Sequence, residues 1–250
     1  DAKRLLQTEL ERLTQLESPE AEVLNQTRVL MELNELLREN NIVAASGSLP
    51  SDLERVWTAR RPGAYHLEYG FSCMGYEVSG ALGVKLADPD REVYTFVGDG
   101  GFLMGHSDLL TSIQEGHKIN VLLFNNSGHQ CIHNLERSQG MGTFGTEFRF
   151  REQSTGGLTG SYVPVNYSEL ASAYGAKTWR VTTLAELHAA IEASKQADVS
   201  TLIEIMVLPG TMTEGYENFW RVGTAAVSEK ESVRKAYKKL NDVVKNLRKY

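Results

Sequence analysis

Short apolar segments alternate with longer amphipathic segments along most of this chain, and this alternation constrains the fold more than any other feature. Strands are predicted at residues 42–45, 92–98, 119–124, 177–181 and 201–207. Helices are predicted among them, at residues 74–87, 107–115, 168–174 and 184–196. Strands that alternate with helices form parallel sheets covered on both faces. The sequence therefore predicts an α/β fold, a parallel β-sheet with helices on both faces.

Helical periodicity marks both ends of the chain. Leucines recur at helical spacing in residues 3–17 and 20–38, with a break at Ser18–Pro19. Such stripes most simply face a core. A last helix is predicted from about residue 228 to 248. We expect three parts, listed in chain order: a helical linker at 1–40, a sheet domain at 41–228 and a C-terminal helix at 229–250.

Composition excludes several classes of protein. The chain has 250 residues, 41% of them hydrophobic, which is enough for a sizeable core. A net charge of −6 argues against nucleic-acid binding, and no apolar run is long enough to cross a membrane. Two cysteines, Cys73 and Cys131, are too few for a disulfide framework, and the first residues do not resemble a secretion signal. We therefore expect a cytoplasmic protein, with Cys73 as a small buried residue.

Polar residues follow two of the predicted strands. One strand ends in Gly98-Asp99-Gly100, and the other in Asn125-Asn126-Ser127-Gly128, with 24 residues between Gly100 and Asn125. A right-handed crossover places two such strand ends side by side or one strand apart. Ligands of parallel sheets bind beyond the carboxyl ends of the strands. We therefore expect both polar segments to belong to one site.

Two familiar phosphate-binding motifs do not fit this site. Leu103 stands where a dinucleotide-binding motif needs its third glycine, and no Gly-Lys-Ser/Thr follows for a P-loop. Asp99 would also repel a diphosphate at contact.

A divalent cation removes the conflict. Mg²⁺ binds oxygen ligands and shares them with substrate phosphates. Asp99 offers a carboxylate oxygen, Asn126 an amide oxygen and Gly128 a backbone carbonyl. Gly100 and Gly101 allow backbone N–H groups to approach the phosphates. The alternative is structural, a glycine–aspartate turn and a hairpin-like Asn-Asn pair.

The Gly98-Asp99-Gly100 motif, 24 residues and an Asn-Asn pair resemble the signature of thiamine diphosphate enzymes. The resemblance extends from about Thr27 to Ala236 and is closest to the trihydroxycyclohexanedione hydrolases of myo-inositol catabolism, in the acetohydroxyacid synthase superfamily. Four longer strings carry it: YHLEYGFSCMGYE at 65–77, GHSDLLTSIQEG at 105–116, GMGTFGTEFR at 140–149 and WRVGTA at 220–225.

The resemblance implies thiamine diphosphate and Mg²⁺ as cofactors, and hydrolysis of a ring C–C bond in a cyclic 1,2-dione, a small-molecule substrate. Gly98, Asp99, Gly100 and Gly101 would bind the diphosphate end. Met74, 25 residues before Asp99, matches the apolar residue that holds the cofactor bent.

The resemblance also implies that the chain needs a further part. In the superfamily, a glutamate on a separate pyrimidine-binding domain acts on the cofactor. That domain comes from the same or another polypeptide, commonly within a homo-oligomer. We expect the helices before residue 41 to expose an apolar face toward it, and the chain alone to be inactive.

The sequence leaves two interpretations for the roles of several residues. His129 and His133 replace residues expected in the hydrolases; on a helix their spacing could bind a transition metal, although hydrogen-bonded side chains are the simpler interpretation. His66 and Glu68 would either contact substrate hydroxyls or form a structural pair. A different decarboxylase or carboligase, or a non-catalytic cofactor-binding module, remains the alternative to the hydrolase.

Overall fold

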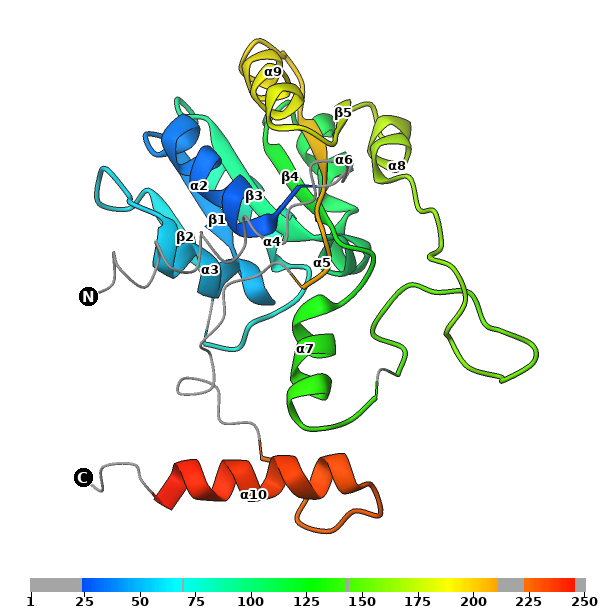
Figure 1. Ribbon diagram of the computed structural model, residues 1–250. Coiled ribbons are helices and arrows are strands. Elements are labelled where there is room, and N and C mark those ends of the chain that lie inside the picture. The colour runs from blue at the N-terminus through cyan, green and yellow to red at the C-terminus, as the bar shows by residue number, and fades with distance from the viewer. Residues whose placement is uncertain (1–23, 69, 143, 211–222, 246–250) are drawn as a thin grey trace.

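The computed structural model describes residues 24–68, 70–142, 144–210 and 223–245 (Figure 1). The predicted helix at 3–17 lies outside the described residues. The strands are β1 (Asn41–Ala44), β2 (Tyr65–Leu67), β3 (Val93–Gly98), β4 (Asn120–Asn125), β5 (Lys177–Val181) and β6 (Thr201–Met206). They form one six-stranded sheet in the order β2-β1-β3-β4-β6-β5, and every pairing is parallel. The predicted parallel α/β fold is confirmed.

Helices pack on both faces of this sheet. One face carries α2 (Gln26–Leu37), α3 (Ser48–Val56) and α9 (Leu184–Lys195), whose apolar residues share a core with Phe96 and Phe124. The other face carries α4 (Tyr76–Ala87), α5 (Asp99–Gly105), α6 (Asp108–Gln114) and α8 (Tyr167–Ala173), packed on Val97 and Leu123. Side chains alternate between the faces along each strand, so β1, β3, β4 and β6 contribute to both cores.

Helix α2 corrects one expectation. Its stripe of Leu30, Leu33 and Leu37 is fully buried in the core with the sheet. The stripe therefore faces the core of this chain, and this helix does not expose an apolar face to another part. The Asn25 side chain accepts a hydrogen bond from the Arg28 N–H at 3.1 Å and so caps the helix start. Because of this packing, we propose that α2 belongs with the sheet domain; the other predicted boundaries stay predictions.

Two helices lie away from the sheet. Helix α7 (Gln130–Ser138) follows β4, and α10 (Glu231–Lys245) lies beyond it (Figure 1). The Ser232 hydroxyl donates to the Gly140 carbonyl at 2.6 Å, which joins the start of α10 to the end of α7. None of the helices in the described part of the chain combines the length and apolar character needed to cross a membrane.

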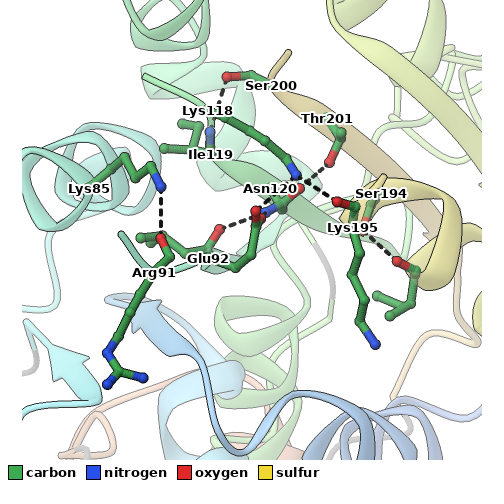
Figure 2. A network of polar contacts seen from close by, with 12 residues as sticks. Lys85, Arg91, Glu92, Lys118, Ile119, Asn120, Ser194, Lys195, Ser200 and Thr201 are labelled. Atoms are coloured by element: carbon green, nitrogen blue, oxygen red, sulfur yellow. Dashed lines mark hydrogen bonds and ion pairs between the residues drawn. The ribbon is translucent and has the colours of Figure 1, made fainter. Parts of the chain in front are cut away.

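Polar contacts tie the amino ends of the central strands together (Figure 2). Glu92 forms an ion pair with Lys118 at 3.0 Å and accepts a hydrogen bond from the Asn120 amide at 2.6 Å. The Asn120 amide oxygen accepts from the Thr201 hydroxyl at 2.8 Å. These contacts fix β3, β4 and β6 at the edge opposite the predicted site, so the two edges of the sheet have separate roles.

Candidate functional site

The strand order reverses at the carboxyl ends of β1 and β3, and we call this place the crevice. The chain leaves β1 toward β2 and leaves β3 toward β4, so the connections depart in opposite directions from neighbouring strands. Helix α3 follows β1 on one face, whereas α5 follows β3 on the other. Ligands of such sheets bind where the strand order reverses. Asp99 follows β3 directly, and Asn126 follows the adjacent β4.

Asp99 is fully buried at the first position of α5. One carboxylate oxygen, Oδ1, accepts a hydrogen bond from the Gly100 N–H at 2.8 Å. The other, Oδ2, accepts from the Gly128 N–H at 3.0 Å. The carboxylate therefore joins the two predicted segments, and the predicted meeting of the two strand ends is confirmed.

Three oxygen atoms converge here, one of them Oδ1 of Asp99. The Asn126 side-chain oxygen lies 2.9 Å from the Gly128 carbonyl oxygen and 3.3 Å from Oδ1 of Asp99. Rotating the Asn126 amide by half a turn would exchange its oxygen and nitrogen, and the nitrogen would then donate to both oxygens. The two orientations have nearly the same shape. As oriented, the Asn126 oxygen lies from each of the other two at the spacing of neighbouring ligands around Mg²⁺, since bonds of about 2.1 Å in an octahedron separate adjacent ligands by roughly 3 Å. The three residues fit a cation.

The electrostatics of Asp99 agree with this fit. Burial raises the pKa of Asp99 to about 7, although the hydrogen bonds from Gly100 and Gly128 act in the opposite direction. A cation beside the carboxylate would favour its charged form. Within the described residues, no three side chains of the His, Cys, Asp and Glu types form a metal-binding cluster. The oxygens beside Asp99 in the described structure are instead those of the Asn126 amide and the Gly128 carbonyl.

A second segment covers Gly128. Gly128 forms an isolated antiparallel bridge with Glu147. The His129 N–H donates to the Thr146 carbonyl at 2.7 Å, and the Phe148 N–H donates to the Ser127 carbonyl at 2.9 Å. A Cβ atom on Gly128 would lie 2.4 Å from the Thr146 oxygen, so only glycine fits. We call residues 127–129 and 146–148 together the clasp. No sequence pattern indicates the clasp, because its two halves are far apart in the chain.

Gly100 is also constrained by a neighbour. A Cβ atom on Gly100 would lie 2.3 Å from Nδ1 of His129, so the imidazole packs directly on the backbone at the start of α5. The ring also contacts Phe148 edge to face, with 5.4 Å between ring centroids. His133 lies on α7, where Nδ1 is 3.2 Å from the Thr146 hydroxyl. These contacts give the two histidines packing and hydrogen-bonding partners, and they do not unite them in a metal cluster.

Met74 lies in the turn between β2 and α4. Gly75, with φ of 93°, packs on Gly105 at the end of α5, and a Cβ atom on Gly105 would lie 2.4 Å from the Gly75 oxygen. The turn therefore lies against α5, the helix that begins at Asp99. The structure does not test the predicted role of Met74, which stays a prediction.

The residues around His66 and Glu68 have structural contacts. Glu68 accepts hydrogen bonds from the N–H groups of Phe71 at 3.0 Å and Cys73 at 2.7 Å. These hydrogen bonds lower the pKa of Glu68 and order the turn that leads to Met74. His66 pairs in register with Val43, and burial lowers the pKa of its imidazole. Cys73 is exposed, so the expectation of a buried cysteine is wrong; it lies in a surface turn rather than in a strand or helix core.

Known proteins resemble this chain in sequence and in fold. A profile of the family "Thiamine pyrophosphate enzyme, C-terminal TPP binding domain" matches residues 45–205. A trihydroxycyclohexane-1,2-dione hydrolase of Clostridium tetani is 56% identical over 229 residues, covering 91% of this chain and 35% of the relative. The corresponding protein of Geobacillus thermodenitrificans is 54% identical over 228 residues, covering 91% and 36%. The chain thus spans about a third of the length of the curated relatives it matches.

Solved structures support the fold. A thiamine diphosphate-dependent 4-hydroxybenzoylformate decarboxylase of Rhodococcus jostii superposes with a TM-score of 0.62 at 21% identity, over 76% of this chain and 34% of that one. A putative thiamin diphosphate-dependent enzyme of Mycobacterium smegmatis gives a TM-score of 0.57 at 22% identity, over 74% and 32%. The likeness at this identity concerns the fold alone. The chain belongs to the thiamine pyrophosphate enzymes and carries their C-terminal cofactor-binding domain.

Proposed function

We propose that this chain binds Mg²⁺ through Asp99, Asn126 and the Gly128 carbonyl, and thiamine diphosphate through the metal and the backbone at Gly98, Gly100 and Gly101. One observation carries the proposal. Oxygens of Asp99, Asn126 and Gly128 converge beyond the carboxyl ends of β3 and β4, where the Asp99 side chain is buried. The matching family profile supports the identity of the cofactor.

We propose further that the chain works within a hydrolase of a cyclic 1,2-dione in inositol catabolism. The support is the hydrolase name shared by relatives that are 54–56% identical. When bound, the cofactor supplies an electron sink for breaking a C–C bond. Asp99 would hold the cation with its charged carboxylate. Buried Asn126 would supply a neutral oxygen, and the turn at Met74 would support the end of the cofactor away from the diphosphate.

The proposed enzyme needs a pyrimidine-binding domain from the same or another polypeptide. Large apolar side chains are exposed on three helices of one face, where α4 contacts α5 and α6; they are Tyr76, Leu86, Leu103, Met104 and Leu110. Exposed apolar surface of this kind is typical of interaction sites. We propose that a homo-oligomer covers it. The acidic net charge supports a small-molecule substrate over nucleic acid, and the free cysteines support a cytoplasmic location.

Substitution of Asp99 tests the proposed cofactor site. In Asp99→Ala, the cation loses its only charged ligand among the three residues, so Mg²⁺-dependent binding of thiamine diphosphate should fall by at least about a hundredfold. Titration calorimetry with Mg²⁺, and again with EDTA, measures this loss. The exposed Asp90 gives the control Asp90→Ala, which should bind normally. Unchanged affinity in a folded Asp99→Ala protein would remove Asp99 from the site.

A further inference from the structure

Glu77 is a buried carboxylate that the proposed function leaves without a role. It lies in the first turn of α4, and only 1% of its surface is exposed. Its Oε1 accepts hydrogen bonds from the Ser46 N–H at 3.2 Å and the Ser46 hydroxyl at 2.7 Å. Its Oε2 accepts from the Gly75 N–H at 2.9 Å. One side chain therefore connects the segment after β1 with the turn before α4.

The same carboxylate also borders the start of α5. A Cβ atom on Gly101 would lie 3.5 Å from Oε1 of Glu77. The backbone of Glu77 is fixed as well, since its carbonyl accepts from the Thr95 hydroxyl of β3 at 2.9 Å. Glu77 thus lies between the ends of β1 and β3, at the crevice where the strand order reverses.

The turn that Glu77 holds needs restraint. Ser72 has a φ of 52° and Gly75 a φ of 93°, both in the left-handed region. A left-handed conformation is costly for a residue with a side chain and persists when the surroundings enforce it. Glu68 binds the Cys73 N–H, and Glu77 binds the Gly75 N–H. The amides on both sides of Met74 are therefore held by carboxylates.

Burial of a carboxylate is unfavourable unless its oxygens are hydrogen-bonded. Within the described residues, the contacts of Glu77 are two backbone N–H groups and a hydroxyl, and no lysine or arginine pairs with it. An apolar side chain would fill the space with a smaller desolvation penalty, but it would not form the hydrogen bonds that connect Ser46 to Gly75. The gain from the carboxylate is a fixed geometry for the turn.

We propose that Glu77 is a positioning residue, which holds Met74 at the crevice between β1 and β3 and thereby sets the geometry of the cofactor rings. This inference rests on the proposed function, in which Met74 supports the cofactor. A simple helix cap is the competing explanation, since a glutamate near a helix start commonly accepts from the N-cap N–H.

The chain offers a matched control for the helix-cap explanation. Glu186 at the start of α9 also accepts three hydrogen bonds. Two come from the N–H and the hydroxyl of Thr182, and the third comes from the N–H of Thr183. Helix α9 packs on the opposite face of the sheet from α4 and α5. Glu77→Gln and Glu186→Gln therefore alter the same number of hydrogen bonds at a helix start, although Glu186 is exposed and Glu77 is buried, and only Glu77 borders α5.

The test compares these variants in the complete native polypeptide. In Glu77→Gln the new NH₂ group faces a donor, so hydrogen exchange at residues 73–77 should accelerate about tenfold, measured by mass spectrometry without cofactor. Affinity for thiamine diphosphate with Mg²⁺ should stay within about threefold, because Asp99 and Asn126 are unchanged. kcat at saturating cofactor should fall at least about tenfold. Glu186→Gln should accelerate exchange only near residues 182–187 and keep kcat within about twofold.

Several outcomes would overturn the inference. One is a kcat in Glu77→Gln as high as in Glu186→Gln at saturating cofactor. Another is unchanged exchange at residues 73–77. If Glu77→Gln does not fold, Ser46→Ala removes only the hydroxyl donor and should lower kcat about threefold with unchanged cofactor affinity; an unchanged kcat there would also count against the role. Failure of the unsubstituted protein to bind thiamine diphosphate would instead overturn the proposed function, and this inference with it.

Discussion

At the scale of single residues, Asp99 lies in surroundings that oppose its own charge. It is fully buried, and the backbone N–H groups that point at it do not offset the loss of water, so its pKa rises to about 7. An ionisable residue whose pKa is strongly shifted by burial is typical of a functional site. On the proposed function, a bound cation would neutralise the carboxylate and relieve this unfavourable burial, so the stability of the site would depend on whether the cation is bound.

The raised pKa predicts how stability of the cation-free protein depends on pH. The folded pKa of about 7 exceeds the ordinary value of 3.8, so between these values the folded state holds a proton that the unfolded state has lost. The contribution of Asp99 to stability is therefore complete below pH 3.8 and is lost as the pH rises through 7. Urea unfolding in EDTA between pH 5 and 8 measures this loss.

Asp99→Asn supplies the reference for that measurement, because it cannot ionise. The difference in unfolding free energy between the native protein and this variant should change with pH and level off above the folded pKa. Adding Mg²⁺ with thiamine diphosphate should restore stability to the native protein at pH 8 and not to the variant. A difference that stays constant from pH 5 to 8 would show that Asp99 does not titrate in this range.

At the scale of structural elements, the clasp controls one of the three oxygens. The Gly128 carbonyl lies beside the Asn126 amide while the same residue bridges Glu147, so the covering segment adjoins the oxygen that we propose as a cation ligand. We predict that Gly128→Ala lowers the free energy of unfolding by about 1–3 kcal/mol, because its Cβ atom would overlap Thr146 and Glu147. The same variant should weaken Mg²⁺-dependent cofactor binding. Chemical denaturation and calorimetry measure the two effects.

Gly142 provides the control for this substitution. It lies in the same loop region, and no atom comes within 4 Å of a Cβ atom placed there. Gly142→Ala should change stability by no more than about 0.5 kcal/mol. If both variants were equally stable, the clasp would not constrain Gly128.

Elements with strong local patterns were predictable from the sequence, and those formed by tertiary contacts were not. The apolar runs of β4 and β5 lie within one residue of their predicted positions. Helix α5 was missed because DGGFLMG has little intrinsic helix propensity; burial of Phe102 stabilises it. Strand β2 has only three residues, too few for a detectable alternation.

The candidate site also has a part that the sequence predicts and a part that it does not. The spacing of Gly98-Asp99-Gly100 and Asn126 was sufficient to predict that they meet, because a crossover of this length joins neighbouring parallel strands. The clasp and the contacts of Glu77 were not predictable, since each joins residues whose separation in sequence carries no periodic signal. Glu77 was visible only as a charged residue at the start of a small-residue helix.

At the scale of the whole molecule, the exposed apolar residues are the main departure from an ordinary monomeric surface. Tyr76, Leu103 and Met104 are all exposed on the helices next to the site, while Phe71 and Phe144 are exposed in loops. The chain also spans about a third of its curated relatives. Both facts agree with a site that is completed by another domain.

On the proposed function, this chain alone carries only part of the cofactor site. The described residues contain a single sheet with one crevice, which on the proposed function binds the diphosphate end of the cofactor. The chain spans about a third of the length of its curated relatives, so on the proposed function the pyrimidine-binding domain lies outside the 250 residues tested. We therefore expect the isolated 250-residue chain to bind thiamine diphosphate weakly, in a Mg²⁺-dependent way, and to show negligible turnover of a cyclic 1,2-dione. Calorimetry and product analysis on the purified chain, alone and with a pyrimidine-binding domain added, measure both properties. Turnover at enzyme-like rates by the chain alone would show that one crevice suffices.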